Sequence, residues 1–107
     1  MLLAEALRLS RELSNQFAIA RTLWTFGGLH QADGQLQQAQ HCLQEALRIW
    51  RELGIPLWQA RALDRLAAVQ AALGQPEAAR AAWRQALVLF EQFGAPEAKV
   101  VAERLHG

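Results

Sequence analysis

The residues of this chain that could bind a metal or act as a nucleophile are three histidines and one cysteine, namely His30, His41, His106 and Cys42. No spacing of two to four residues joins a pair of them into a typical ligand motif. His41 and Cys42 are adjacent, so on a helix their side chains point about 100° apart and do not easily share one ligand. Cys42 falls on an apolar face, where a cysteine is typically a small buried hydrophobe. We therefore expect no metal, no cofactor and no catalytic residues, because no nucleophile, base and orienting group can be assembled.

Two arginines are better suited to recognising a ligand. Arg21 and Arg61 are related by a shift of 40 residues. A guanidinium can donate two parallel hydrogen bonds to a carboxylate, either on an acidic side chain or at the C-terminus of a peptide. The alternative is that both arginines are solvated or pair with local acids such as Glu97 or Asp64. The sequence leaves the two interpretations open.

The four tryptophans fall into three kinds. Trp50 and Trp83 occupy apolar helix positions and are expected in the core, whereas Trp58 comes just after a proline and could fasten that turn to the preceding helix. Trp24 differs, because the residue 40 positions later is Asp64. Packing therefore does not require an apolar side chain at that position.

The elements that must position these residues follow from an internal repeat. The string EALRIWRELG begins at Glu45, and related strings begin at Glu5 and Gln85, each 40 residues away. Self-similarity at such a period is typical of stacked helical repeats. Aligning residues 15–54 on 55–94 without gaps pairs identical residues, mostly small or apolar, at Ala20/Ala60, Arg21/Arg61, Leu23/Leu63, Ala32/Ala72, Gly34/Gly74, Gln35/Gln75, Ala39/Ala79, Ala46/Ala86, Leu47/Leu87 and Gly54/Gly94.

Helix-breaking residues divide the chain at regular intervals. Ser14-Asn15, Asp33-Gly34 and three glycines followed two residues later by proline separate stretches rich in good helix formers. Short loops force consecutive helices into antiparallel hairpins. We predict an all-α, right-handed α-hairpin solenoid in one domain, with a half-repeat at 1–14, repeats at 15–54 and 55–94, and a half-repeat at 95–107. The six expected helices are 2–13, 16–33, 36–53, 56–73, 76–93 and 96–106.

Composition limits the function classes. The net charge is +1, with acids and bases interspersed, which gives no electrostatic reason to expect nucleic acid or an anionic membrane surface. No apolar run reaches the roughly 18 residues of a membrane span. The single cysteine cannot form an internal disulfide, and the N-terminus does not look like a signal peptide. A cytoplasmic location is the expectation.

The repeats resemble the tetratricopeptide repeat, whose pattern W-x2-L-G-x2-Y is followed by A-x3-F in a helix-turn-helix. The chain differs from the family pattern in two ways. Its repeat unit has 40 rather than 34 residues, and the tyrosine position holds His30 and Gln70. Longer units of this kind are similar to those of bacterial multidomain regulators. The small residues are expected to let two helices approach closely. The matching strings are Leu23, Phe26, Gly27, His30, Gly34, Ala39, Leu43, Ala46 and Leu47 in the first unit, and Leu63, Leu66, Ala67, Gln70, Gly74, Ala79, Trp83, Ala86 and Leu87 in the second.

This resemblance implies a concave surface lined by the first helix of each hairpin. If Phe26 and Leu66 occupy the buried leucine position, the residues two and five places earlier point toward that surface. These are Trp24 and Asp64, and Arg21 and Arg61. Thr25, Arg65 and Gln31 are expected to flank them and complete the set of ligand-binding candidates.

The function implied by the resemblance is protein–protein interaction, with a peptide or a partner's helix held on the concave surface, in a domain of a larger bacterial regulatory protein. The alternative is self-assembly through the exposed terminal half-repeats, with a homodimer as the simplest product. Its candidate contact residues are Leu3, Leu7, Val101 and Leu105.

Overall fold

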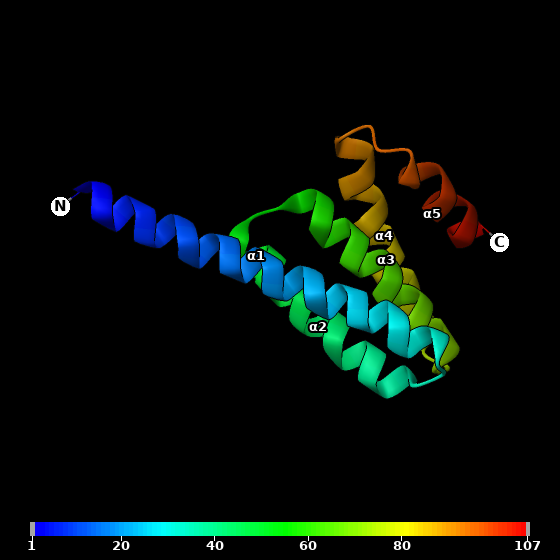
Figure 1. The fold of residues 1–107 in the computed structure, drawn as a ribbon. Coiled ribbons are helices and arrows are strands. Elements are labelled where there is room, and N and C mark those ends of the chain that lie inside the picture. The colour runs from blue at the N-terminus through cyan, green and yellow to red at the C-terminus, as the bar shows by residue number, and fades with distance from the viewer. Residues whose placement is uncertain (1, 107) are drawn as a thin grey trace.

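The computed structural model describes the backbone of residues 2–106 and, apart from Leu2, Leu3 and Ser10, their side chains. Its elements are α1 (Leu2–Ala32), α2 (Leu36–Leu53), α3 (Pro56–Ala72), α4 (Pro76–Gln92) and α5 (Glu97–His106), and no strand occurs within residues 2–106 (Figure 1). Each helix packs mainly against the next one along the chain. The prediction of an all-α fold of stacked helical hairpins is confirmed.

The turns between helices share one geometry. Gly34, Gly54, Gly74 and Gly94 all have positive φ, between 61° and 78°. At the end of α2, the N–H of Gly54 donates to the carbonyl of Arg51, and the N–H of Ile55 donates to that of Trp50. This pair of bonds satisfies carbonyls that the helix leaves unpaired, and the left-handed conformation it needs favours glycine. Proline then starts α3 and α4, where a missing N–H costs nothing.

The predicted break at Ser14-Asn15 is wrong in this structure. The predicted helices 2–13 and 16–33 fall on one helix of 31 residues, α1, which ends at Ala32, so residues 2–106 hold five helices rather than six. The reason lies in the turn chemistry, since Ser14 and Gln16 stand where the next unit has Gly54 and Pro56. Without either residue, α1 continues, and its N-terminal part extends past the end of α2 (Figure 1).

The core draws buried apolar side chains from all five helices, and its largest fully buried side chains are Trp50, Phe90, Leu43, Val69 and Val101. Gly27 allows the close approach of α1 and α2 that the repeat pattern predicts, because a Cβ there would lie 2.6 Å from Cγ of Leu43. Trp50 stacks on Trp58 with ring centroids 4.8 Å apart. The prediction that Trp50 belongs to the core is confirmed, whereas Trp83 is only half-buried.

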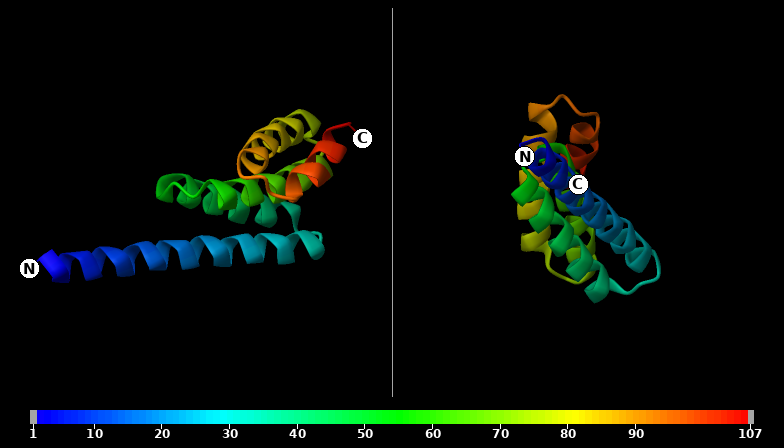
Figure 2. Two further views of the ribbon diagram at one scale, coloured as in Figure 1. Left: turned by 90° about the horizontal axis from the view of Figure 1, so that it is seen from above. Right: turned by 60° about the vertical axis from the view of Figure 1, so that its left-hand side comes forward.

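Two predicted exposures are wrong. Phe26, expected to be buried, is 49% exposed, while its counterpart Leu66 is 5% exposed. The helix that carries Leu66, α3, packs against both α2 and α4, whereas α1 packs mainly against α2 and lies on the outside of the molecule (Figure 2). Val101, expected on an exposed end of the solenoid, is completely buried in the core because α5 folds onto α4.

The other terminal candidates are placed as follows. Leu7 is 52% exposed, and Leu105 is partly buried against the core. The side chain of Leu3 lies outside the described residues. No helix within residues 2–106 combines the length and the apolar character needed to cross a lipid bilayer.

Candidate functional site

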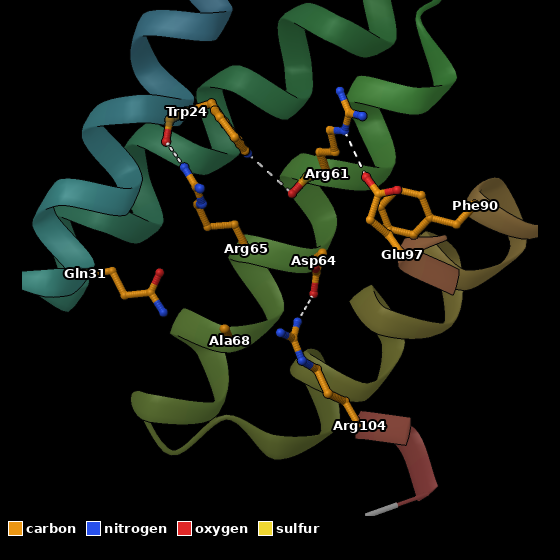
Figure 3. A pocket seen from close by; sticks show the side chains of 9 residues that line it. All are labelled: Trp24, Gln31, Arg61, Asp64, Arg65, Ala68, Phe90, Glu97 and Arg104. Carbon is orange, nitrogen blue, oxygen red and sulfur yellow. Dashed lines mark hydrogen bonds and ion pairs between the residues drawn. The ribbon is translucent and has the colours of Figure 1, made fainter. Parts of the chain in front are cut away.

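A hollow of about 420 Å³, called the groove below, lies between α1, α3 and the α4–α5 pair (Figure 3). Five of the seven residues that the sequence proposed for ligand binding line it. Its lining consists of Trp24, Gln31, Arg61, Asp64, Arg65, Ala68, Phe90, Glu97 and Arg104.

The other two candidates, Arg21 and Thr25, lie elsewhere. Both line a separate shallow hollow of about 350 Å³ on α1, beside Phe17 and Phe26. The hydroxyl of Thr25 donates to the carbonyl of Arg21 at 2.9 Å, a bond within the helix. The structure therefore does not bring Arg21 and Arg61 into one site.

Arg61 pairs with an acid of the same chain. Its Nε donates to Oε2 of Glu97 at 3.1 Å, and both side chains are about one-third exposed. The guanidinium also lies 4.8 Å from the centroid of the Trp58 ring. Of the two interpretations left open by the sequence, pairing with a local acid is the one that the structure shows for Arg61.

The carboxylate of Asp64 is also bound by other side chains of the same chain. Its Oδ1 accepts hydrogen bonds from the indole of Trp83 at 3.0 Å and from the guanidinium of Arg104. Glu97 and Arg104 are seven residues apart, so they lie on the same side of α5 and both reach α3 (Figure 3). Arg104 was not among the site residues expected from the sequence, although its seven-residue spacing from Glu97 is a detectable signal.

Arg65 is the exception among the groove cations. Its guanidinium carbon lies 3.6 Å from the centroid of the Trp24 ring, and Nη1 donates to the carbonyl of Trp24 at 2.9 Å. Burial lowers the pKa of Arg65, while the nearby Asp64 carboxylate acts in the opposite direction. No carboxylate of the described residues forms an ion pair with it.

Neighbouring groups fix this arrangement. The indole N–H of Trp24 points at the carbonyl of Arg61, at 3.4 Å, which orients the ring beneath Arg65. Gly28 leaves room for the guanidinium, since a Cβ there would lie 2.8 Å from Nη1 of Arg65. The amide of Gln31 points into the same space (Figure 3). Together, Arg65 and Gln31 present hydrogen-bond donors to a ligand above a floor that includes Ala68.

Comparison with known proteins identifies the repeat. A sequence model of the tetratricopeptide repeat matches residues 18–92, more than two-thirds of the chain. The chain belongs to the tetratricopeptide repeat family. No curated protein matches it. Tetratricopeptide repeats generally mediate protein–protein interaction, and this is the general role that family membership supports.

Within the tetratricopeptide repeat, each unit contributes a first and a second helix. Here α1, α3 and α5 hold the first-helix positions, and most of the groove residues come from them (Figure 3). Among the described residues, no group of three His, Cys, Asp or Glu side chains could hold a metal ion. The lining residues can form hydrogen bonds, ion pairs and apolar contacts, which is chemistry suited to binding a polypeptide.

Proposed function

We propose that this tetratricopeptide repeat domain binds an acidic segment of a protein partner in the groove, with Arg65 holding a carboxylate of that segment. The observation that carries this proposal is the state of Arg65, which is half-buried and stacked on Trp24 without a carboxylate partner in the described residues. A partly desolvated cation gains more from an anionic ligand than a solvated one does. A carboxylate can also accept two parallel hydrogen bonds from a guanidinium.

The remaining charges of the groove support the same assignment. Arg61 and Arg104 are paired with Glu97 and Asp64, so their charges are offset within the chain. Arg65 is left as the one uncompensated charge among the lining residues. Because its guanidinium is already fixed by Trp24, little side-chain entropy is lost when a ligand binds.

The length of the repeat unit bears on the kind of protein to which this domain belongs and on its location. We propose a domain of a larger, cytoplasmic bacterial regulatory protein. The 40-residue unit and the resemblance to the long repeats of bacterial multidomain regulators support this, as does the single cysteine.

The test is a binding titration with a defined acidic probe. A fluorescein-labelled peptide of about ten residues with a Glu-rich, free C-terminus is titrated by fluorescence anisotropy, beside the same peptide with Gln replacing Glu and an amidated end. We expect Arg65→Gln to weaken binding of the acidic peptide by about tenfold or more, corresponding to loss of a charge-assisted pair.

Arg84→Gln is the matched control, because Arg84 is exposed on α4 outside the groove and also carries one positive charge. It should leave the affinity nearly unchanged. Equal losses in the two variants would mean that the peptide responds to net charge alone, and would contradict a site at Arg65.

Self-association is the second candidate function, and one observation favours it. Among the described residues, nine large apolar side chains are exposed, and six of them lie on α1. Val101 is buried and cannot provide the contact, so the opening helix is the better surface. The exposed side chains on α1 are Leu7, Leu9, Leu13, Ile19, Phe26 and Leu29.

A further inference from the structure

The outward face of α1 consists of Ala18, Ile19, Thr22, Phe26 and Leu29, on the side of the helix opposite Ala20 and Gly27. Gly27 lies against Leu43 of α2, whereas Ile19, Phe26 and Leu29 are 46%, 49% and 55% exposed. Two shallow, mostly apolar hollows of about 350 and 370 Å³ lie over this face and share Ala18, Thr22 and Phe26. In Figure 2, α1 forms the outermost layer of the molecule.

The second repeat shows what such a face is built to contact. The residues of α3 that correspond to Thr22, Phe26 and Leu29 are buried at 0%, 5% and 0% exposure. The residue that corresponds to Ala18 is Trp58, which stacks on Trp50 of α2. Since α2 and α3 form an antiparallel hairpin, the outward face of a first helix in this chain accepts an antiparallel helix. The buried counterparts are Ala62, Leu66 and Val69.

The face of α1 also has a pattern that is complementary to itself. Residues three or four positions apart form a stripe along it that starts with a cation and ends with an anion. Between these charges, Asn15 and the small Ala18 and Thr22 are followed by the large Phe26 and Leu29. The stripe runs through Arg11, Asn15, Ala18, Thr22, Phe26, Leu29 and Asp33.

We propose that a second copy of this chain docks on the outward face of α1, antiparallel, with the two-fold axis passing near Thr22. In this register Phe26 of each copy lies over Ala18 of the other, so a large side chain meets a small one. Arg11 of each copy lies near Asp33 of the other. Both contacts occur twice because a two-fold interface uses the same patch on both subunits, which closes the assembly at a dimer.

The second copy is favoured by this match of shape and charge. The α1 helix of the second copy would cover α1 of the first copy as α2 covers α3, with an apolar helix that runs in the opposite direction. This interface specifies which surface and which helix register self-association, the second candidate function, would use. It is independent of the groove, because Trp24 and Gln31 lie on another side of α1.

Sedimentation velocity of the full chain tests the surface. We expect a monomer–dimer equilibrium in the micromolar range, because one helix on one helix is a small interface. Phe26→Glu should weaken dimerisation by about tenfold or more, as it places two like charges in the contact. Val88→Glu is the control, since Val88 is 65% exposed on α4 and lies outside the interface. A monomer at about 200 μM, or a dimer that Phe26→Glu leaves unchanged, would overturn the proposal.

Charge reversal and cross-linking test the register. Arg11→Asp should weaken the dimer, and combining it with Asp33→Arg should restore it. The native cysteine is first removed with Cys42→Ala, a change that places at 42 the residue type found at the equivalent position of the next repeat, Ala82. In this background Thr22→Cys should form a disulfide between copies under mild oxidation, and Glu77→Cys should not. Failure of both the rescue and the selective cross-link would rule out this register. Retained binding of the acidic peptide by Phe26→Glu would show that the groove is intact, so the two proposals can fail separately.

Discussion

The hairpins α1–α2 and α3–α4 have the same turns and nearly the same packing, but their first helices differ in surroundings. Gly34 and Gly74 end α1 and α3 with almost equal φ, 76° and 78°. Yet Phe26 on α1 is half exposed and its counterpart Leu66 on α3 is buried, because α3 lies between two second helices and α1 contacts one. The comparison shows that a repeated sequence specifies the hairpin, whereas position in the stack decides what each face does.

The largest effect expected from this comparison concerns these two positions. Leu66→Ala leaves a cavity in the core and should lower the free energy of unfolding by about 2–5 kcal/mol. Phe26→Ala removes a half-exposed side chain and should cost less than about 1 kcal/mol. Urea unfolding should be followed at a protein concentration well below the dissociation constant of the dimer, where dimerisation adds little to stability. Similar losses in both variants would mean that α1 is covered much as α3 is.

A pair of adjacent glycines sharpens the comparison. Gly27→Ala forces a Cβ against the buried Leu43 and should cost about 1–3 kcal/mol, even though alanine favours the helix. In Gly28→Ala the nearest atoms to the new Cβ belong to the flexible end of the Arg65 side chain, so stability should stay within about 1 kcal/mol of the parent. The guanidinium must move off Trp24, however, and affinity for the acidic peptide should fall several-fold. Thermal melts and peptide titrations of both variants separate these effects, and a stable Gly27→Ala would contradict the close packing of α1 on α2.

The smallest effect concerns the tie between α5 and α3. Glu97→Gln removes the partner of Arg61 but keeps the shape of the side chain, and should cost less than about 1 kcal/mol because the pair is one-third exposed. The loss should shrink further at 1 M salt. A change in stability well above this in urea unfolding would mean that α5 depends on this ion pair rather than on the burial of Val101.

Local rules in the sequence predicted much of the fold. Glycine at the turns, proline at the helix starts and apolar spacing of three and four residues indicated four of the five helices closely. The Ser14-Asn15 break failed because these residues interrupt a helix only weakly, and nothing enforces the left-handed turn that Gly54 allows. Val101 was misplaced because the path of α5 depends on its packing against α4.

The site was only partly predictable for a related reason. The resemblance to the tetratricopeptide repeat predicted that Trp24, Arg61, Asp64 and Arg65 share one surface, and in the structure all four line the groove. Which arginine lacks a carboxylate partner depends on side-chain geometry between α3 and α5. Arg65 was one candidate among seven in the sequence, and its lack of a carboxylate partner became evident only from the structure.

The central claim, that the groove binds an acidic segment at Arg65, is most directly tested by NMR titration of the ¹⁵N-labelled chain with the Glu-rich peptide. The indole N–H signal of Trp24, assigned with Trp24→Phe, reports on the ring beneath Arg65. We predict saturable shifts of this signal and of the Gln31 side-chain amide, both lost in Arg65→Gln. Shifts confined to Ala18, Thr22 and Leu29, with an unchanged Trp24 indole, would contradict the claim and assign binding to the outward face of α1.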